Sequence, residues 1–389
     1  MQVPEKREFH STHPWLRFEV DLRPAPAQLW IMLGECQSKC EHLAGVPLRP
    51  DVNRELHEVY LAKGVAATTA IEGNTLSEAE VRRQIEGTLT VPPSKEYLKQ
   101  EVANILEASN LILGEVASGQ LPPLDPGRIK MLNRIVLKDL NLSNDRAVPG
   151  EFRDRSVGVM DYRGAPAGDC EYLTGRLTEW LNAMPFPKGQ EMAGAILKAM
   201  LAHLYLAWIH PIGDGNGRTA RLVEVQILLC SGIPSPAAQL LSNHYNQTRS
   251  EYYRQLGAAS KSGGDVIPFL MYAVRGLRDG LVEQIERVRQ LQWEIAWQNY
   301  VHERFDGLEN RADLRRKRLL LELSQRGEVV ADTIPDLSAS TARDYTNRAK
   351  TLSRDLNALV GMGLLGRHGR KVWAKRESIL AFLPTRARG

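Results

Sequence analysis

The chain has 389 residues, of which 43% are hydrophobic and 25% are charged, so it is long enough for two or three domains with cores of their own. It contains no collagen-like, mucin-like or prion-like tract, and its first 18 residues lack the apolar stretch of a signal peptide. Residues 310–389 hold 17 Lys and Arg against 8 Asp and Glu, a net charge of +9, which leaves −5 for the remainder. A basic tail on a mildly acidic body predicts an anionic partner for the tail.

The cysteines favour a reducing compartment. Cys36, Cys40, Cys170 and Cys230 fit no disulfide framework, so we expect a cytoplasmic protein. Cys36, Cys40 and His42 could be imagined as metal ligands, but a C-x-x-x-C pattern without a second pair is weak evidence for a metal site. We favour two thiols that lie one helical turn apart.

Periodic apolar residues predict that the first part of the chain is helical. The second of its predicted helices should end at Gly73-Asn74, residues that suit a left-handed helix end, and the third begins with a capping-box pattern at Ser77 and Glu80. The Pro- and Gly-rich stretch at residues 118–127 predicts a boundary. The predicted helices cover residues 26–43, 52–71, 77–86 and 101–115.

The pattern changes between residues 149 and 173. A strand-like run at residues 156–160 and a turn rich in Gly and Pro predict a small β-hairpin lying over helices. The apolar run at residues 192–209 is interrupted by Lys198 and His203, so it predicts a buried helix and no association with a membrane. Helices are predicted at residues 174–184, 191–209, 218–230 and 249–260, followed by a long amphipathic helix with a break at residues 266–305.

The basic tail predicts a helix at residues 314–325, a short helical turn near 334–340 and a second long helix at 345–365, which Gly361 and Gly363 end.

Two short strands should follow the tail helices and turn at His368-Gly369. Helices followed by a β-wing are typical of a winged helix-turn-helix, with residues 353–363 as the reading helix or its continuation and Arg354 exposed. The alternative is a small helical cap that docks on its own body or on a partner subunit.

The chemistry concentrates in "HPIGDGNGRTAR", residues 210–221. Pro211 disfavours helical geometry at His210, so the buried helix should end there with the imidazole at its mouth. Three glycines let the backbone turn tightly. A new helix begins at about residues 217–218, and its free amides and positive dipole end make the loop an anion site.

The side chains of this loop suit a nucleotide with a metal ion. Arg218 and Arg221 share one face of the first helical turn, where planar guanidinium groups match phosphate oxygens, and Asn216 adds a neutral donor. Asp214 is explained by a Mg²⁺ ion that bridges it to phosphates. His210 can then accept a proton from an attacking hydroxyl. The spacing fits neither a P-loop nor a Rossmann or kinase loop, and an ordinary Gly-rich connection does not explain this density of chemical groups.

The segment resembles the signature of Fic-domain proteins, H-x-F-x-[DE]-G-N-G-R-x-x-R, with Ile212 in place of the usual Phe. The resemblance extends over residues 124–283 and implies a mainly α fold, a Fic helical core with a small β-hairpin flap. We therefore divide the chain into an N-terminal helical region (1–123), the Fic core (124–283), a helical linker (284–309) and a winged helix-turn-helix-like domain (310–389).

The resemblance implies a protein adenylyltransferase. Such an enzyme moves AMP from ATP to a Ser, Thr or Tyr hydroxyl of a target protein, with self-modification as a further outcome, and releases pyrophosphate. It makes His210 the general base and Asp214 the Mg²⁺ ligand at the α- and β-phosphates. Arg218 would bind the β-phosphate and Arg221 the γ-phosphate. The implied nucleotide-binding set is Gly215, Asn216, Gly217, Arg218, Thr219, Ala220 and Arg221, of which Asn216 and Arg218 are also counted as catalytic.

Outside the motif the resemblance implies fewer contacts. The flap near residues 156–160 would clamp the target segment by strand addition, although Pro166 alone remains where many relatives have two prolines. Tyr253 and Ser260 fall where the family contacts adenosine; packing on a helix surface is the open alternative.

A second stretch, "TTAIEGN" at residues 68–74, resembles the inhibitory motif [ST]-x-x-x-E-[GN] of self-inhibited Fic proteins through Thr68, Glu72 and Gly73. Thr68 and Glu72 share one helix face, and a carboxylate near a helix C-terminus needs a compensating cation. The resemblance identifies that cation as Arg221, which would then be withheld from ATP. An ordinary helix that ends in Glu-Gly-Asn is the alternative.

Three functions stay open at this point. The first is an autoinhibited adenylyltransferase. The second is the same fold removing AMP, with Glu72 positioning a water, or transferring another nucleotide. The third is a DNA-binding regulator with a nucleotide-sensing core, which can coexist with the first. The sequence also leaves open whether the chain forms a homodimer.

Overall fold

The computed structural model describes residues 7–142, 147–159, 162–186 and 188–380. The chain divides into two compact units, Met1–Ile285 and Glu286–Gly389. The finer boundaries expected at residues 123 and 309 stay predictions. The described helices of the first unit are α1 (Phe9–Thr12), α2 (Ala27–Gly45), α3 (Pro50–Ile71), α4 (Glu78–Ile85), α5 (Glu96–Ser118), α6 (Pro126–Val136), α7 (Cys170–Ala183), α8 (Glu191–Ile209), α9 (Asn216–Cys230), α10 (Ser235–Ala238), α11 (Leu240–Gln247) and α12 (Arg249–Lys261).

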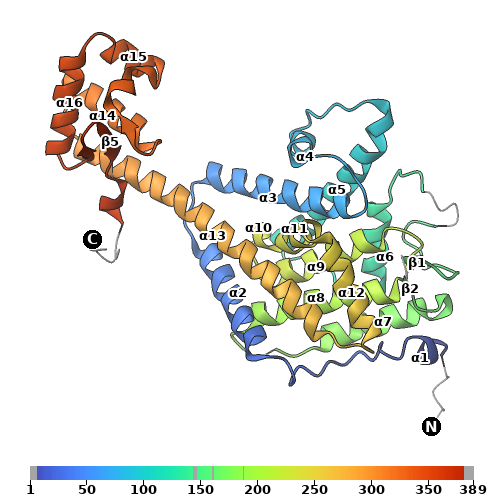
Figure 1. The fold of residues 1–389 in the computed structure, drawn as a ribbon. Helices are drawn as coiled ribbons and strands as arrows, with labels where there is room; N and C mark the ends of the chain where they lie inside the picture. The colour runs from blue at the N-terminus through green and yellow to red at the C-terminus, as the bar shows by residue number, and fades with distance from the viewer. Residues whose placement is uncertain (1–6, 143–146, 160–161, 187, 381–389) are drawn as a thin grey trace. The chain divides into compact units, whose positions relative to one another are not determined.

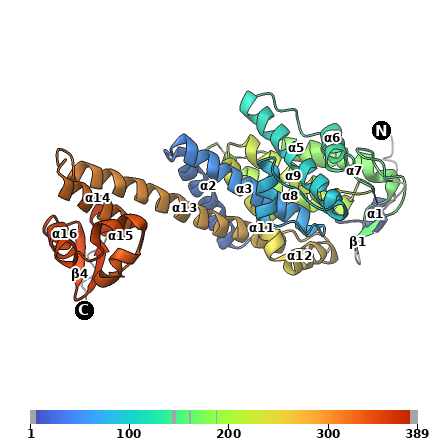
Figure 2. The ribbon, with the colours of Figure 1, turned by 90° about the horizontal axis from the view of Figure 1, so that it is seen from above.

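Helices α8 and α9 form the centre of the first unit (Figures 1 and 2). Helix α8 packs against α9, α2, α7 and α12, and α9 also contacts α3, α5, α6 and α10. Because α8 is enclosed on all sides, it is apolar all round rather than along one stripe. It is long and apolar enough to cross a membrane, but 78% of its apolar window is buried inside the protein, as expected for a core helix.

The ends of the N-terminal helices follow the sequence signals. Gly73 has φ 102°, and the N–H of Asn74 donates to the Thr69 carbonyl at 3.1 Å, so α3 ends in the left-handed turn that was predicted. Ser77 and Glu80 form a capping box at the start of α4. Both predictions are confirmed.

The cysteine pair lies inside α2. Cys36 and Cys40 are both fully buried, whereas His42 is exposed on the same helix. The three side chains therefore do not converge on one point, and the thiols pack in the core.

Helix α13 (Ile267–Arg304) is continuous, so the predicted break in it is wrong. Its glycines are packing positions: a Cβ at Gly276 would collide with the His244 ring, and one at Gly280 would lie 3.0 Å from the Leu240 side chain. These glycines let α11 approach closely without interrupting the helix.

The second unit combines helices with a small antiparallel sheet. The strand order is β3-β5-β4, and the β4–β5 hairpin turns at Gly369 with φ 58°. Strand β3 was not predicted. The elements of this unit after α13 are α14 (Arg311–Ser324), β3 (Val329–Val330), a 3-10 helix (Ala331–Asp336), α15 (Ala339–Tyr345), α16 (Ala349–Gly361), β4 (Leu365–His368), β5 (Lys371–Ala374) and a 3-10 helix (Arg376–Ile379).

The predicted single helix at residues 345–365 is wrong. Helix α15 ends at Tyr345 and α16 begins at Ala349, because Asn347 adopts a left-handed conformation with φ 58°. Asparagine tolerates this region better than most residues, so it serves as the break. The chain as a whole is mainly α-helical, with a three-stranded antiparallel sheet near the C-terminus.

Candidate active site

His210 lies at the end of the central helix. Helix α8 ends at Ile209, and His210 is its C-terminal cap with φ 49° and ψ 56°. This left-handed conformation costs a residue with a Cβ about 1–2 kcal/mol, so contacts with the surrounding residues must stabilise His210 in it. The prediction that the helix stops here, before Pro211, is confirmed.

A β-hairpin lies against this helix end. Strands β1 (Gly158–Val159) and β2 (Tyr162–Arg163) pair antiparallel, and the Tyr162 hydroxyl donates to the Trp208 carbonyl at 2.8 Å. A hairpin is therefore present, but the turn predicted for the Gly- and Pro-rich stretch is wrong, because strand β2 precedes that stretch. Met160 lies outside the described residues.

One cavity of about 460 Å³ unites the end of α3, the hairpin and the glycine-rich loop. These segments are far apart in the sequence. The motif at residues 210–221 and the inhibitory stretch at residues 68–74 therefore both contribute to this cavity. The lining residues are Glu72, Arg155, Ser156, Val157, Gly158, His210, Gly213, Asp214, Gly215, Asn216 and Gly217.

The backbone at the start of α9 forms the anion-binding part of the cavity. Gly215 caps the helix with φ 73°, and the first turn leaves backbone N–H groups without partners inside the helix. The Asn216 side chain is engaged elsewhere: its Oδ1 accepts from the Ile212 N–H at 3.0 Å and its Nδ2 donates to the Ile212 carbonyl at 2.7 Å. Asn216 therefore fixes the loop, and the backbone N–H groups are left as anion donors.

Ile212 is the residue that replaces the Phe of the motif. It is 1% exposed and forms an antiparallel bridge with Phe152. The replacement therefore keeps a buried apolar anchor beneath the loop.

Asp214 offers a carboxylate to the cavity, where its side chain is 30% exposed. It accepts from the Gly215 N–H and lies 3.5 Å from Nη2 of Arg218. Among the described residues, no group of three or more His, Cys, Asp and Glu is placed to hold a metal. A single carboxylate of this kind is the type of group that can hold Mg²⁺ beside phosphates.

The environment of His210 keeps its imidazole neutral. Burial lowers its pKa to about 4, and the Arg153 charge acts in the same direction. A hydrogen bond with the Ala207 backbone and the charges of Glu72 and Asp214 oppose this shift. The imidazole is thus in its basic form near neutral pH.

Glu72 and Arg221 form an ion pair at the cavity. Nη2 of Arg221 lies 2.6 Å from the Glu72 carboxylate and 3.0 Å from the Thr68 carbonyl. Arg221 is buried, with a side chain 1% exposed, against 33% for Glu72. Burial opposes ionisation of Glu72, but the Arg221 charge and hydrogen bond, helped by Arg218 and His210, hold the pKa of the carboxyl below its usual value.

The Glu72 carboxylate also lies against the start of α9. A Cβ built on Gly217 would collide with Oε1 of Glu72 and would lie 3.2 Å from Nη1 of Arg221. The carboxylate therefore occupies the place at the helix N-terminus where an anion is expected to bind.

The loop at residues 210–221 lies within a segment that matches a known protein family. The model of the Fic/DOC family matches residues 123–228. The chain is 27% identical over 252 residues to the protein adenylyltransferase Fic of Nematostella vectensis, covering 63% of this chain and 53% of that protein. It is 30% identical over 227 residues to protein adenylyltransferase fic-1 of Caenorhabditis elegans, covering 58% and 41%.

By its match over residues 123–228, the chain contains a Fic/DOC domain. It is related to Fic protein adenylyltransferases and spans about half, or less, of the length of these relatives. Both relatives carry the name of protein adenylyltransferases.

Solved structures share the fold. A Fic family protein from Desulfovibrio desulfuricans superposes with a TM-score of 0.57 at 20% identity, over 91% of this chain and 97% of that one. The Fic-1 fragment from C. elegans gives 0.53 at 25% identity, over 68% and 74%.

A further acidic residue of the Fic site was missed by sequence reasoning. Nη1 of Arg218 donates to Oε1 of Glu101 at 3.0 Å, and Oε2 of Glu101 accepts from Nδ2 of Asn74 at 2.9 Å. Each of the two loop arginines is therefore paired with a carboxylate from the N-terminal helices. No local pattern marks Glu101, which lies in the interior of α5.

Asn133 of α6 is a second residue that the sequence did not indicate. It is fully buried, and its Nδ2 donates to the Asp214 carbonyl at 2.9 Å and to the Thr219 hydroxyl at 3.2 Å. Its Oδ1 accepts from the Gly150 N–H at 2.9 Å. Asn133 thus joins the Fic loop to the segment that leads into the flap.

Six of the nine predicted nucleotide contacts lie outside the described cavity lining, namely Arg218, Thr219, Ala220, Arg221, Tyr253 and Ser260. Thr219 and Ala220 are buried beneath the loop, where the Thr219 hydroxyl meets Asn133. Ser260 is also buried, and its hydroxyl donates to the Gly257 carbonyl at 3.0 Å.

Tyr253 lies beside the inhibitory segment. Its hydroxyl is 3.5 Å from the Ile71 carbonyl. A role for Tyr253 at adenosine stays a prediction.

Proposed function

We propose that this Fic protein is an autoinhibited protein adenylyltransferase, which transfers AMP from ATP to a Ser, Thr or Tyr hydroxyl of a target protein. One observation carries the proposal. Glu72, which pairs with Arg221 at 2.6 Å, lies against the N-terminal end of α9 and lines the same cavity as His210 and Asp214. A carboxylate that fills an anion site would compete with the phosphates of ATP for that site.

The reaction follows from the residues around the cavity. The target hydroxyl would lie along the flap near residues 156–159, and His210 would take its proton through a neutral imidazole. The oxygen then bonds to the α-phosphorus as the bond to the bridging oxygen breaks, and pyrophosphate leaves on the opposite side. The α9 N–H groups and Arg218 would hold the phosphates in line for this displacement.

A Mg²⁺ ion bound at Asp214 would neutralise negative charge on the α- and β-phosphates. The partly exposed carboxylate, which lines the cavity, fits this role.

Inhibition would act on the γ-phosphate. While Glu72 pairs with Arg221, this arginine would not be available to bind the γ-phosphate. The Glu72 carboxylate would also fill the space beside Gly217 that the phosphate needs. Rotation of the Glu72 side chain would free both.

The test compares the wild type with Glu72→Gly and His210→Ala, each incubated in cell lysate with Mg²⁺ and ATP labelled on the α-phosphate. We expect Glu72→Gly to label itself or lysate proteins more strongly than the wild type, and His210→Ala to label neither. Equal labelling by the wild type and Glu72→Gly would count against the inhibitory role. Labelled GTP, CTP and UTP in parallel test transfer of another nucleotide, and loss of label from a modified protein tests AMP removal.

We also propose that the second unit is a winged helix that binds DNA. Helices α15 and α16 precede the β4–β5 wing, in the order expected for this module. Exposed cations lie on or just before α16 (Arg348, Lys350, Arg354) and on the wing (Arg367, Arg370). This arrangement supports binding to a phosphate backbone.

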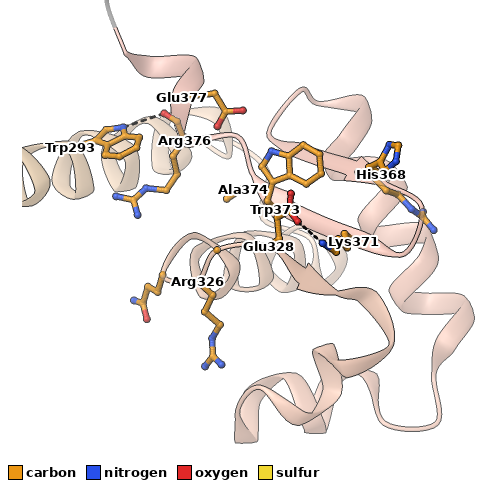
Figure 3. Close-up of a pocket in the computed structure, with 12 residues that line it drawn as sticks. Trp293, Arg326, Glu328, His368, Lys371, Trp373, Ala374, Arg376 and Glu377 are labelled. Carbon is orange, nitrogen blue, oxygen red and sulfur yellow. Dashed lines mark hydrogen bonds and ion pairs between the residues drawn. The ribbon is translucent and has the colours of Figure 1, made fainter. Parts of the chain in front are cut away.

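A hollow of about 950 Å³ beside the wing, which Arg367 also lines, is a poorer candidate for DNA (Figure 3). Two of its other cations are engaged: Lys371 pairs with Glu328 at 3.0 Å, and the Arg376 guanidinium stacks 4.5 Å from the Trp293 ring centre. DNA should therefore contact α16 and the wing tip. We expect a gel shift with DNA that weakens steeply as the salt concentration rises and is weaker still in Arg354→Ala. A protein that gives no gel shift even at low salt would refute the proposal.

A further inference from the structure

The segments that flank the flap bind consecutive carbonyl groups at the end of α8. The Ala165 N–H donates to the Ile209 carbonyl at 3.2 Å, and Nε of Arg153 donates to the His210 carbonyl at 2.7 Å. The N–H of Arg153 donates to the Pro211 carbonyl at 3.0 Å. The last carbonyls of a helix have no partner within it, so these bonds complete the helix end and fix the direction of the chain through His210.

Arg153 is central to this arrangement. It is 6% exposed, and among the described residues every hydrogen bond of its guanidinium goes to a backbone carbonyl rather than to a carboxylate. A buried cation without an acidic partner is costly. Here the negative end of the α8 dipole compensates it, since Arg153 lies directly on the last carbonyls of that helix.

The same guanidinium also holds both sides of the flap. Nη1 donates to the Arg155 carbonyl at 2.6 Å, on the strand β1 side, and Nη2 donates to the Ala165 carbonyl, on the strand β2 side. Gly164 lies between these groups: a Cβ there would be 2.8 Å from Cβ of His210 and 3.1 Å from Nη2 of Arg153. The flap base and the His210 backbone are thus joined through one side chain.

We propose that Arg153 is a positioning residue that holds His210 in its left-handed conformation and keeps the flap in register with the imidazole. The inference rests on the proposed transfer reaction and adds a residue to it. The flap presents the acceptor hydroxyl and His210 accepts its proton, so the two must keep a fixed separation. Arg153 is the group that contacts both.

The test uses the full chain with Glu72→Gly, into which Arg153→Met or Arg153→Lys is introduced. Methionine keeps much of the length without donors, whereas lysine keeps the charge at the helix end. Transfer of labelled AMP should fall by about 100-fold with methionine, the scale expected when a catalytic group is misplaced by about 1 Å, and by less with lysine. The Kd for ATP with Mg²⁺ should stay within about twofold, because the phosphates bind the start of α9 and not the flap.

Arg134→Met serves as the matched control, since Arg134 is 61% exposed and lies 3.7 Å from Glu151 near the same segment. Its transfer rate should not change. An unchanged rate in Arg153→Met, or a loss of ATP binding equal to the loss of transfer, would overturn the proposal, because the latter indicates a general structural role. If Arg153→Met does not fold, Arg153→Lys carries the same two measurements.

Hydrogen exchange gives a readout that does not depend on activity. In either Arg153 variant, the amides of Gly164 and Ala165, which bond to Val157 and Ile209, should exchange faster, while those of α9 should not. If Glu72→Gly binds ATP but transfers no label, the proposed function fails, and this exchange experiment still decides the inference. Unchanged exchange at Gly164 and Ala165 would end it.

Discussion

The carboxylate of Glu72 reaches Nη2 of Arg221 at 2.6 Å across 149 positions of sequence. It lies against Gly217, where the N–H groups of α9 begin. The contact is made by a partly exposed acid at the end of α3 and a fully buried base on α9. The acid can therefore leave by rotating into solvent, whereas the arginine stays in place to receive another anion.

Thermal stability should report this exchange of anions. Glu72→Gly leaves the buried Arg221 without its carboxylate, so its Tm without nucleotide should fall below that of the wild type. ATP with Mg²⁺ at about 100 times its Kd should stabilise the variant by about 2.7 kcal/mol and the wild type by much less. Thermal shift assays with and without ATP measure both effects. ATP should no longer raise the Tm of the double variant Glu72→Gly, Arg221→Ala. If ATP still stabilises this variant, Arg221 is not the phosphate ligand.

Gly217 tests whether the carboxylate and the phosphate share one space. A Cβ at this position would collide with Oε1 of Glu72 and crowd Arg221. Gly217→Ala in the Glu72→Gly background should therefore weaken ATP binding at least about tenfold, because the methyl group takes the place of a phosphate oxygen. Gly257→Ala, at a helical glycine with open space around its Cβ direction, is the control. Equal ATP affinity in both variants would place the phosphate elsewhere.

The pH dependence of transfer should reflect the buried position of His210. Its pKa is lowered to about 4, first by burial and then by the Arg153 charge. The basic imidazole is therefore present above about pH 4, and protonation removes it only below that. Glu72 raises this pKa, so its removal in Glu72→Gly shifts the loss of activity to still lower pH. Single-turnover rates between pH 5 and 8 should be nearly constant; a halving near pH 6.5 would show an ordinary histidine.

Local patterns explain which features the sequence could predict. Apolar periodicity predicted most of the helices, and the capping box at Ser77 and the glycine turn at Gly73 predicted helix ends, because these signals act within a few residues. The break expected in α13 and the single helix expected at residues 345–365 failed for the opposite reason. Packing of Gly276 against α11 and the conformation of Asn347 depend on the tertiary fold.

The candidate site shows the same division. The loop at residues 210–221 is continuous in sequence, so its anion-binding character was predictable, and Glu72 was marked by a motif of its own. Glu101, Asn133 and Arg153 come from other segments and touch the loop only after folding. A lone Glu, Asn or Arg in a helix or turn carries no sign of its partner, so sequence reasoning could not find them.

Asp355 should control the stability of the second unit. It is 1% exposed and accepts from Nε of Arg315 at 2.6 Å, Nε of Arg316 at 2.9 Å and the Tyr345 hydroxyl at 3.1 Å. The carboxylate thus ties α14 and the end of α15 to α16. Asp355→Ala leaves two guanidinium groups and a hydroxyl without it, and should lower the free energy of unfolding of this unit by about 3 kcal/mol.

Urea unfolding followed by Trp297, which is buried in this unit, measures the effect of Asp355→Ala. Asp344→Ala is the control, because its ion pair with Arg318 at 2.9 Å involves a half-exposed arginine and should contribute less than about 1 kcal/mol. Since Asp355 lies on α16, the same variant should weaken DNA binding while leaving ATP binding in the first unit unchanged. A variant that unfolds like the wild type but still loses DNA binding would make Asp355 part of the DNA contact instead.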